Sequence, residues 1–138
     1  MLDDTTEAGG RAERRLREEE IAWITTVRPD GQPQSVPVWF IWDGEGFLIY
    51  SQPGRQKLHN IERNPRICLN LNSNAQGGDV VRAEGTAEIV EDASPATEVP
   101  EYVEKYQGSI ARIGFDPDGF ARAYSVAIRV TPTRWQVW

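Results

Sequence analysis

Short runs of alternating apolar and polar residues, separated by glycine, proline and aspartate, constrain the fold of this chain more than any other feature. Residues 21–27 alternate between two faces, and most of them are β-branched or aromatic. The same period of two recurs at 67–71 and 125–130, and residues 80–91 form a longer run with Gly85 at a predicted bulge. Such runs are typical of an antiparallel sheet.

The turns between these runs predict hairpins. Pro29–Gln32 is turn chemistry, so we expect residues 35–42 to return as one strand, and residues 47–51 to add a third strand of a meander. Pro37 cannot donate to a ladder, which indicates an edge, a bulge or a surface where a flat ligand packs. Pro132 is expected to break the last strand.

Helices are expected between the strands. Residues 1–10 are polar and end in two glycines, which predicts a flexible tail, and residues 11–20 are rich in helix formers. Further helices are predicted from Pro100 to about Gly108 and from Pro117 to about Ala123. With about six strands, the predicted fold is mainly β (α+β), a six-stranded split barrel with short flanking helices, in one domain over residues 11–138.

One predicted helix carries an unusual charge pattern. It follows the turn at Pro53 and Gly54, and its first turn holds Arg55 and Lys57 but no acid. The amides and the positive dipole end of a helix N-terminus favour negative charge, so a bound phosphate would turn this arrangement into a site. The alternative is a solvated basic helix.

Composition excludes several classes of function. At 138 residues the net charge is −6 and the pI is near 4.8, which disfavours general attraction to nucleic acid or to an anionic membrane. Cys68 and His59 are the only residues of their kinds, so we expect no metal site and no intrachain disulfide. The sequence contains neither a long apolar run nor a secretory signal, which favours the cytoplasm.

The five tryptophans exceed what a small barrel encloses. Four of them lie on two predicted strands, so a ligand or another subunit is expected to cover some of them.

Four segments together resemble a known family: the split-barrel flavin- and deazaflavin-binding proteins related to pyridoxamine 5′-phosphate oxidase. The resemblance covers about residues 12–138 and rests on TTVRPDGQP (25–33), SVPVWF (35–40), KLHNIERNPR (57–66) and AEGTA (83–87). The segment RVTPTR (129–134) resembles the branch that uses the deazaflavin coenzyme F420.

This resemblance implies a homodimer with cofactor sites between the subunits. The cofactor phosphate would lie on Arg55 and Lys57. The tricyclic ring would contact residues of the second and third strands and of the basic helix: Ser35, Val36, Pro37, Val38, Trp39, Ile49, Tyr50, Ser51 and Asn60. Candidates to approach from the partner chain are Gln76, Gly77 and Trp138.

The resemblance also implies the reaction, hydride transfer between reduced F420 and a small planar conjugated acceptor. The last strand has Arg134-Trp135-Gln136-Val137-Trp138 in place of the Arg-x-His pattern with which the oxidase holds its substrate, so pyridoxamine phosphate is not expected as a substrate. No residue is assigned a catalytic role, because the cofactor supplies the chemistry. The alternatives are an FMN-binding oxidoreductase and a deazaflavin carrier without turnover, and a haem-binding relative is disfavoured by the position of His59 on the basic helix.

Overall fold

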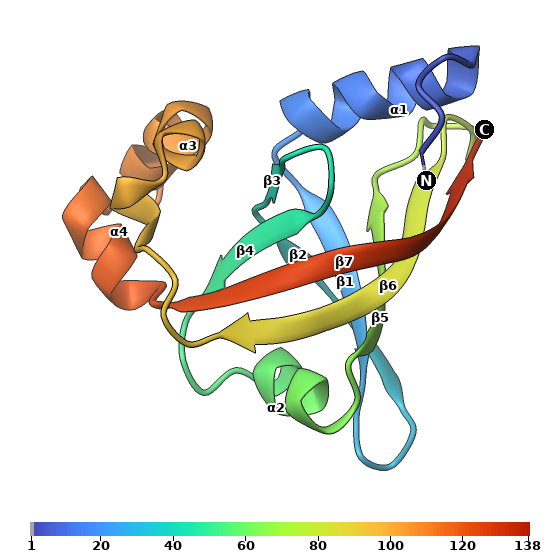
Figure 1. The fold of residues 1–138 in the computed structure, drawn as a ribbon. Coiled ribbons are helices and arrows are strands. Elements are labelled where there is room, and N and C mark those ends of the chain that lie inside the picture. The colour runs from blue at the N-terminus through green and yellow to red at the C-terminus, as the bar shows by residue number, and fades with distance from the viewer. Residues whose placement is uncertain (1) are drawn as a thin grey trace.

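Seven antiparallel strands form one curled sheet in the computed structural model, which describes residues 2–138 (Figure 1). The strands are β1 (Ala22–Val27), β2 (Pro33–Val38), β3 (Ile41–Trp42), β4 (Phe47–Ser51), β5 (Arg66–Leu71), β6 (Val81–Val90) and β7 (Val126–Val137). The helices are α1 (Glu7–Glu18), α2 (Gln56–Arg63), α3 (Pro100–Arg112) and α4 (Pro117–Ala123), with a 3₁₀ turn at Ala96–Glu98. The order across the sheet is β2-β1-β5-β6-β7-β4-β3.

The predicted strand over residues 35–42 is divided into two strands at opposite edges of the sheet. β2 pairs with β1, whereas β3 pairs with β4. Trp39 and Phe40 alone connect them, so the two edges must approach each other here and the sheet curls into a split barrel. The expected meander of three strands is therefore wrong, and the division explains seven strands instead of six. The split-barrel fold class is confirmed.

Helix α3 supplies the hydrogen bonds that this break in the strand would otherwise lack. The Phe40 amide donates to the Tyr106 hydroxyl at 2.8 Å, and that hydroxyl lies 2.7 Å from the Glu20 carbonyl oxygen. The Lys105 ammonium donates to the Phe40 carbonyl at 3.0 Å and lies 3.9 Å from the centroid of the Phe40 ring. Both backbone groups of Phe40 are thus satisfied without a strand partner.

Lys105 makes stability depend on pH. Burial lowers the pKa of Lys105 from 10.5 to about 8. Between about pH 8 and pH 10 the unfolded chain therefore keeps a proton that the folded chain has lost, and the free energy of unfolding should rise with pH. Urea denaturation at pH 7.5, 8.5 and 9.5 should show this rise in the natural chain and a flatter profile in Lys105→Met. Equal slopes in the two proteins would contradict the assignment.

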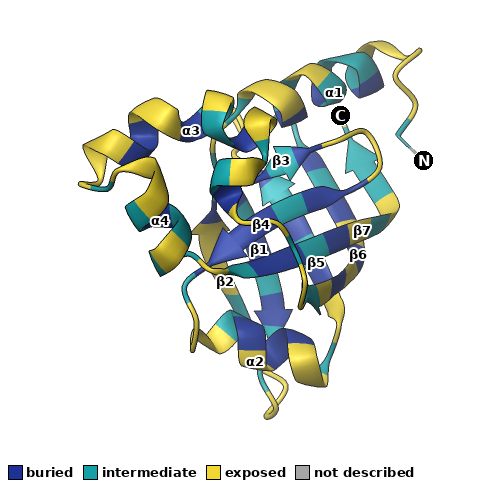
Figure 2. Cartoon of the chain, turned by 60° about the vertical axis from the view of Figure 1, so that its left-hand side comes forward, coloured by how far each residue is buried: buried dark blue, intermediate teal, exposed yellow. Residues whose placement is uncertain are grey.

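The interior consists of two apolar clusters. The larger lies between the inner face of the sheet and helices α1 and α2, where Leu16, Leu58 and Ile61 are buried. The smaller lies under α3 and α4 and is mostly aromatic, including Tyr102, Tyr106 and Phe120. Figure 2 shows buried positions along the strands and exposed positions on the outward sides of the helices. The aromatic cluster is the one that borders the candidate site.

At both ends of the chain the secondary structure differs from the expectation. Met1 lies outside the described residues, and residues 7–10 of the predicted tail form the first turn of α1. Helix α1 begins at Glu7 because the Thr6 hydroxyl caps it by accepting from the Gly9 amide at 3.0 Å. At the other end β7 continues through Pro132. This proline faces Gly85, and the β6–β7 register shifts between Glu84 and Gly85, so the ladder accommodates a residue without an amide hydrogen. The bulge predicted at Gly85 is confirmed.

Two helices predicted in the interior of the sequence are confirmed. The short helix predicted over residues 117–123 is confirmed, and the Asp116 carboxylate caps it by accepting from the Gly119 amide. The basic helix is confirmed as α2. Within residues 2–138 we find no helix with the length and apolar character needed to cross a membrane.

Candidate functional site

A cavity of about 380 Å³ lies where β2 leaves the sheet and β4 ends. Lys57 of α2, Tyr102 of α3 and Phe120 of α4 line its remaining sides. The lining residues are Ile21, Pro37, Val38, Trp39, Tyr50, Ser51, Gln52, Arg55, Lys57, Tyr102, Ile113, Phe120 and Tyr124. This volume lies within the range of small-molecule and cofactor sites.

One group of lining residues, the cationic end, consists of Ser51, Gln52, Arg55 and Lys57. Arg55 is the N-cap residue of α2, and no side chain caps this helix. Its first turn contains no acid, and among residues 2–138 neither Arg55 nor Lys57 forms an ion pair. The Arg55 guanidinium instead donates to the Gln52 side-chain oxygen. The cationic end thus offers positive charge and helix amides with no anion of the chain to meet them.

Lys57 is held in an unfavourable place for a cation. Its side chain is half-buried, and burial together with the charge of Arg55 lowers the pKa of its ammonium group. A bound anion would oppose both effects by restoring an opposite charge. The electrostatics of this end therefore suit a phosphate group.

The other group, the aromatic end, consists of Trp39, Tyr102, Ile113, Phe120 and Tyr124. Trp39 stacks on Phe120 with ring centroids 5.5 Å apart, and Phe120 stacks on Tyr124 at 4.4 Å. Trp39 also lies parallel to Tyr106 at 4.7 Å, with 6° between the ring planes. These rings form a wall suited to a flat, apolar ligand.

Two hydroxyl groups that line the cavity are already engaged. The Tyr50 hydroxyl donates to the Ser94 carbonyl at 2.6 Å, and the Ser51 hydroxyl donates to the Gln52 carbonyl at 2.8 Å. Burial raises the pKa of Tyr50, which keeps its proton on the hydroxyl. Neither group is placed to give a proton to a ligand without first breaking a contact.

The structure brings half of the predicted site residues together at this cavity: Pro37, Val38, Trp39, Tyr50, Ser51, Arg55 and Lys57. Pro37 lies on the edge strand β2, as its missing amide indicated. Ser35 and Val36 lie earlier on that strand, exposed and outside the lining.

Two predicted contact residues, Ile49 and Asn60, do not line the cavity, because their side chains point into the interior. Ile49 is 0% exposed within the larger apolar cluster. Asn60 is also 0% exposed, and its amide nitrogen donates to the Thr26 hydroxyl at 2.9 Å and to the Gln34 side-chain oxygen at 3.2 Å. Its oxygen accepts from Gln56 at 2.9 Å. Asn60 therefore holds α2 against the sheet and so fixes the position of the helix start that carries the cationic end.

Three predicted residues, Gln76, Gly77 and Trp138, lie away from the cavity of their own chain. They are at the end of the sheet beside α1, opposite α4 (Figure 1), where the Trp138 amide pairs with the Val80 carbonyl. Trp138 is 59% exposed. Within one chain they cannot reach the pocket, so any contact with a ligand there would have to come from a second copy.

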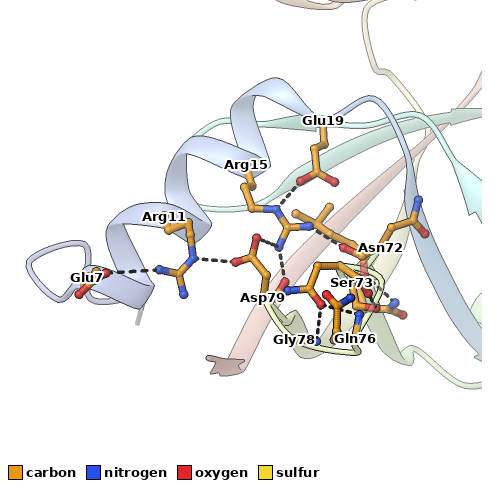
Figure 3. Close-up of polar contacts among 12 residues, drawn as sticks. Glu7, Arg11, Arg15, Glu19, Asn72, Ser73, Gln76, Gly78 and Asp79 are labelled. Carbon is orange, nitrogen blue, oxygen red and sulfur yellow. Dashed lines mark hydrogen bonds and ion pairs between the residues drawn. The ribbon is translucent and has the colours of Figure 1, made fainter.

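The loop over residues 73–79 is held by α1 (Figure 3). Arg11 donates to the Asp79 carboxylate at 2.6 Å, and Arg15 donates to the backbone carbonyls of Asn72 and Asp79. Asp79 itself has a left-handed φ of 55°. These contacts fix both ends of the loop and leave its tip, with Gln76 and Gly77, exposed.

Sequence reasoning missed the contribution of the helices between β6 and β7. Tyr102, Phe120 and Tyr124 line the cavity, as do Ile113, Ile21 and Gln52. The helix predicted from Pro100 contains Tyr102 and Tyr106, but nothing local indicated that one of these tyrosines would face a pocket formed with β2 and β4.

Comparison with known proteins identifies the family. The family model described as "Pyridoxamine 5′-phosphate oxidase" matches residues 10–138. The chain belongs to this family. A curated pyridoxine/pyridoxamine 5′-phosphate oxidase from Aeromonas hydrophila is 43% identical over 47 residues, which is 33% of this chain and 22% of that enzyme. A second such enzyme, from Citrobacter koseri, is 34% identical over 62 residues, so the matches span about a quarter of these relatives.

Solved structures extend the likeness in fold to nearly the whole chain. An F420 reductase is 29% identical with a TM-score of 0.72, covering 90% of this chain and 94% of that one. HutZ, the heme storage protein from Vibrio cholerae, has a TM-score of 0.68 at 17% identity, covering 96% and 95% of the two chains. The second likeness shows the shared fold alone. Within residues 2–138 of this chain, no cluster of three or more histidine, cysteine, aspartate or glutamate side chains could hold a metal ion.

Proposed function

We propose that this protein binds coenzyme F420 in the cavity and transfers a hydride between the reduced cofactor and a small planar conjugated acceptor. The observation that carries the proposal is the pairing of an acid-free helix N-terminus, with Arg55 and Lys57, and an aromatic wall in one cavity. A phosphate and a flat ring are the two features that this pairing complements. The identity of 29% with an F420 reductase over 90% of the chain supports the deazaflavin over FMN.

The residues of the chain would bind the cofactor and orient it. Arg55, Lys57 and the first amides of α2 would hold the phosphate, and Pro37, Val38 and Trp39 would lie along the ring. The deazaflavin supplies the hydride when bound, so the chain needs no nucleophile. The rings of the aromatic end would exclude water and hold the acceptor flat. The proposal places the protein in a reducing cytoplasm, where the thiol of Cys68 would stay free.

Binding of oxidised F420 and of FMN should be compared in parallel by quenching of tryptophan fluorescence, because Trp39 lines the cavity. The proposal expects tighter binding of F420, and a Trp39→Phe variant that binds but shows weaker quenching. Equal or tighter binding of FMN would overturn the preference for the deazaflavin.

Turnover separates an enzyme from a carrier. Reduced F420 should be mixed anaerobically with the protein and a panel of enones and quinones, following the return of the oxidised cofactor's absorbance. The proposal expects at least one acceptor to be reduced faster than in the protein-free control. Tight binding with no acceleration by any acceptor would favour the carrier.

We also propose a homodimer in which the tip of the 73–79 loop and Trp138 approach the partner's cavity. The exposed Trp138 and the distance of these residues from their own cavity support this arrangement. A stable pair would bury an interface of about 1,200 Å² or more. Sedimentation equilibrium at micromolar concentration with F420 bound should give twice the mass of the chain, and a monomer mass would contradict the dimer.

A further inference from the structure

One residue of the aromatic end has a buried polar atom without a partner. Tyr102 lies on α3, is 0% exposed and lines the cavity. Its hydroxyl makes no hydrogen bond with any group of residues 2–138. Nearby tyrosines differ, since the Tyr50 hydroxyl donates to the Ser94 carbonyl and the Tyr106 hydroxyl bonds the backbone of Phe40.

An unpaired buried hydroxyl disfavours the folded state, and native structures contain few of them. Packing alone would be served as well by phenylalanine, because Tyr102 is surrounded by rings. The centroids of Tyr106, Tyr50 and Phe120 lie 4.9, 5.1 and 6.0 Å from that of Tyr102. The hydroxyl therefore has no role in the contacts of the folded chain, which suggests a role toward a ligand.

The surroundings define the chemistry of that ligand. Burial strongly raises the pKa of Tyr102, so its hydroxyl stays protonated and acts as a donor. The aromatic end contributes no cation, since both lining cations come from the α2 side of the cavity. A carboxylate placed here would lose its hydration without gaining an opposite charge, whereas a neutral oxygen would lose less and gain the hydrogen bond.

We propose that the Tyr102 hydroxyl donates a hydrogen bond to an uncharged oxygen, of the ketone or quinone kind, on a flat ligand stacked in the aromatic end. The inference rests on the proposed function in that this ligand would be the hydride acceptor. It assigns Tyr102 as the residue that selects acceptors carrying such an oxygen.

The test compares 1-indanone, a flat aryl ketone, with indane, which has the same rings and no oxygen. Binding of each to the full-length protein is measured by saturation-transfer NMR titration, with saturating oxidised F420 and again without it. The natural chain should bind 1-indanone about tenfold more tightly than indane, the effect of one neutral hydrogen bond, and Tyr102→Phe should lose that preference.

Stability provides the second measurement. Tyr102→Phe should unfold at the same temperature as the natural protein or higher, because it removes an unpaired group. The matched control Tyr106→Phe should unfold at a lower temperature and keep the preference for the ketone, because its hydroxyl holds Phe40 and does not line the cavity.

Several results would overturn the inference: no binding of the ketone at millimolar concentration, an equal preference in the natural chain and Tyr102→Phe, or a loss of stability in Tyr102→Phe as large as in Tyr106→Phe. Neither probe is asked to accept a hydride. Failure of F420 binding or turnover would therefore count against the proposed function and leave the ketone result to stand separately.

Discussion

Replacing Arg55 and Lys57 together with alanine is expected to weaken F420 binding by about 2 to 5 kcal/mol, or roughly 30-fold to several thousandfold in Kd. Each side chain would make a charge-assisted contact with the phosphate, and Lys57 makes its contact from a half-buried position. The fold should be unaffected or slightly more stable, because the double variant removes two cations from the positive end of the α2 dipole. Fluorescence titration gives the affinity and urea denaturation gives the stability.

The matched control removes two cations elsewhere. Arg63 lies in the last turn of α2 and Arg66 begins β5, and both are exposed. Arg63→Ala/Arg66→Ala changes the net charge equally but should keep the natural affinity, since neither residue lines the cavity. If the two double variants bind F420 equally well, the cationic end is a solvated surface and the phosphate lies elsewhere.

Gly85→Ala should produce the largest loss of stability among single substitutions considered for this chain. A Cβ at this position would lie 2.4 Å from the Thr131 carbonyl oxygen and 3.0 Å from the Pro132 Cα, both of them backbone atoms. The bulge beside Gly85 lets β6 and β7 approach this closely, so relief requires moving one strand of the longest ladder in the sheet. We expect a loss of roughly 3 kcal/mol or more in the free energy of unfolding.

Gly108→Ala provides the control for the added methyl group. Gly108 lies within α3, and a Cβ there would meet only the Arg112 guanidinium, at 3.7 Å. Alanine should be neutral or stabilise the helix by up to about 1 kcal/mol. Urea denaturation of both variants tests the comparison, and a Gly85→Ala variant within 0.5 kcal/mol of the natural protein, a margin typical of surface changes, would refute the proposed clash.

Features set by neighbouring residues were predictable from the sequence. Pro117 predicted the start of α4, and the residues after Pro53 and Gly54 predicted a helix whose first turn carries basic residues and no acid. Gly85 predicted a bulge because a residue without a side chain inside a strand indicates close backbone approach. In each case the residues that determine the feature lie within a few positions of it.

Features set by distant partners were not predictable in this way. The break at Phe40 depends on Tyr106, 66 residues later, which satisfies the backbone that a strand partner would otherwise pair. The burial of Asn60 depends on Thr26 and Gln34 of two other strands. The aromatic end depends on where α3 and α4 pack, which no local period specifies. The family resemblance pointed to β2 and β4, residues of which line the cavity, but it assigned no role to Tyr102.

A crystal structure of the full chain with oxidised F420 tests most directly whether one cavity holds both the phosphate and the ring of the cofactor. We predict a cofactor phosphate within hydrogen-bonding distance of Arg55, Lys57 and the first amides of α2, with the tricycle along Pro37, Val38 and Trp39. A cofactor bound away from these residues, or a cavity that stays empty at saturating F420, would contradict it.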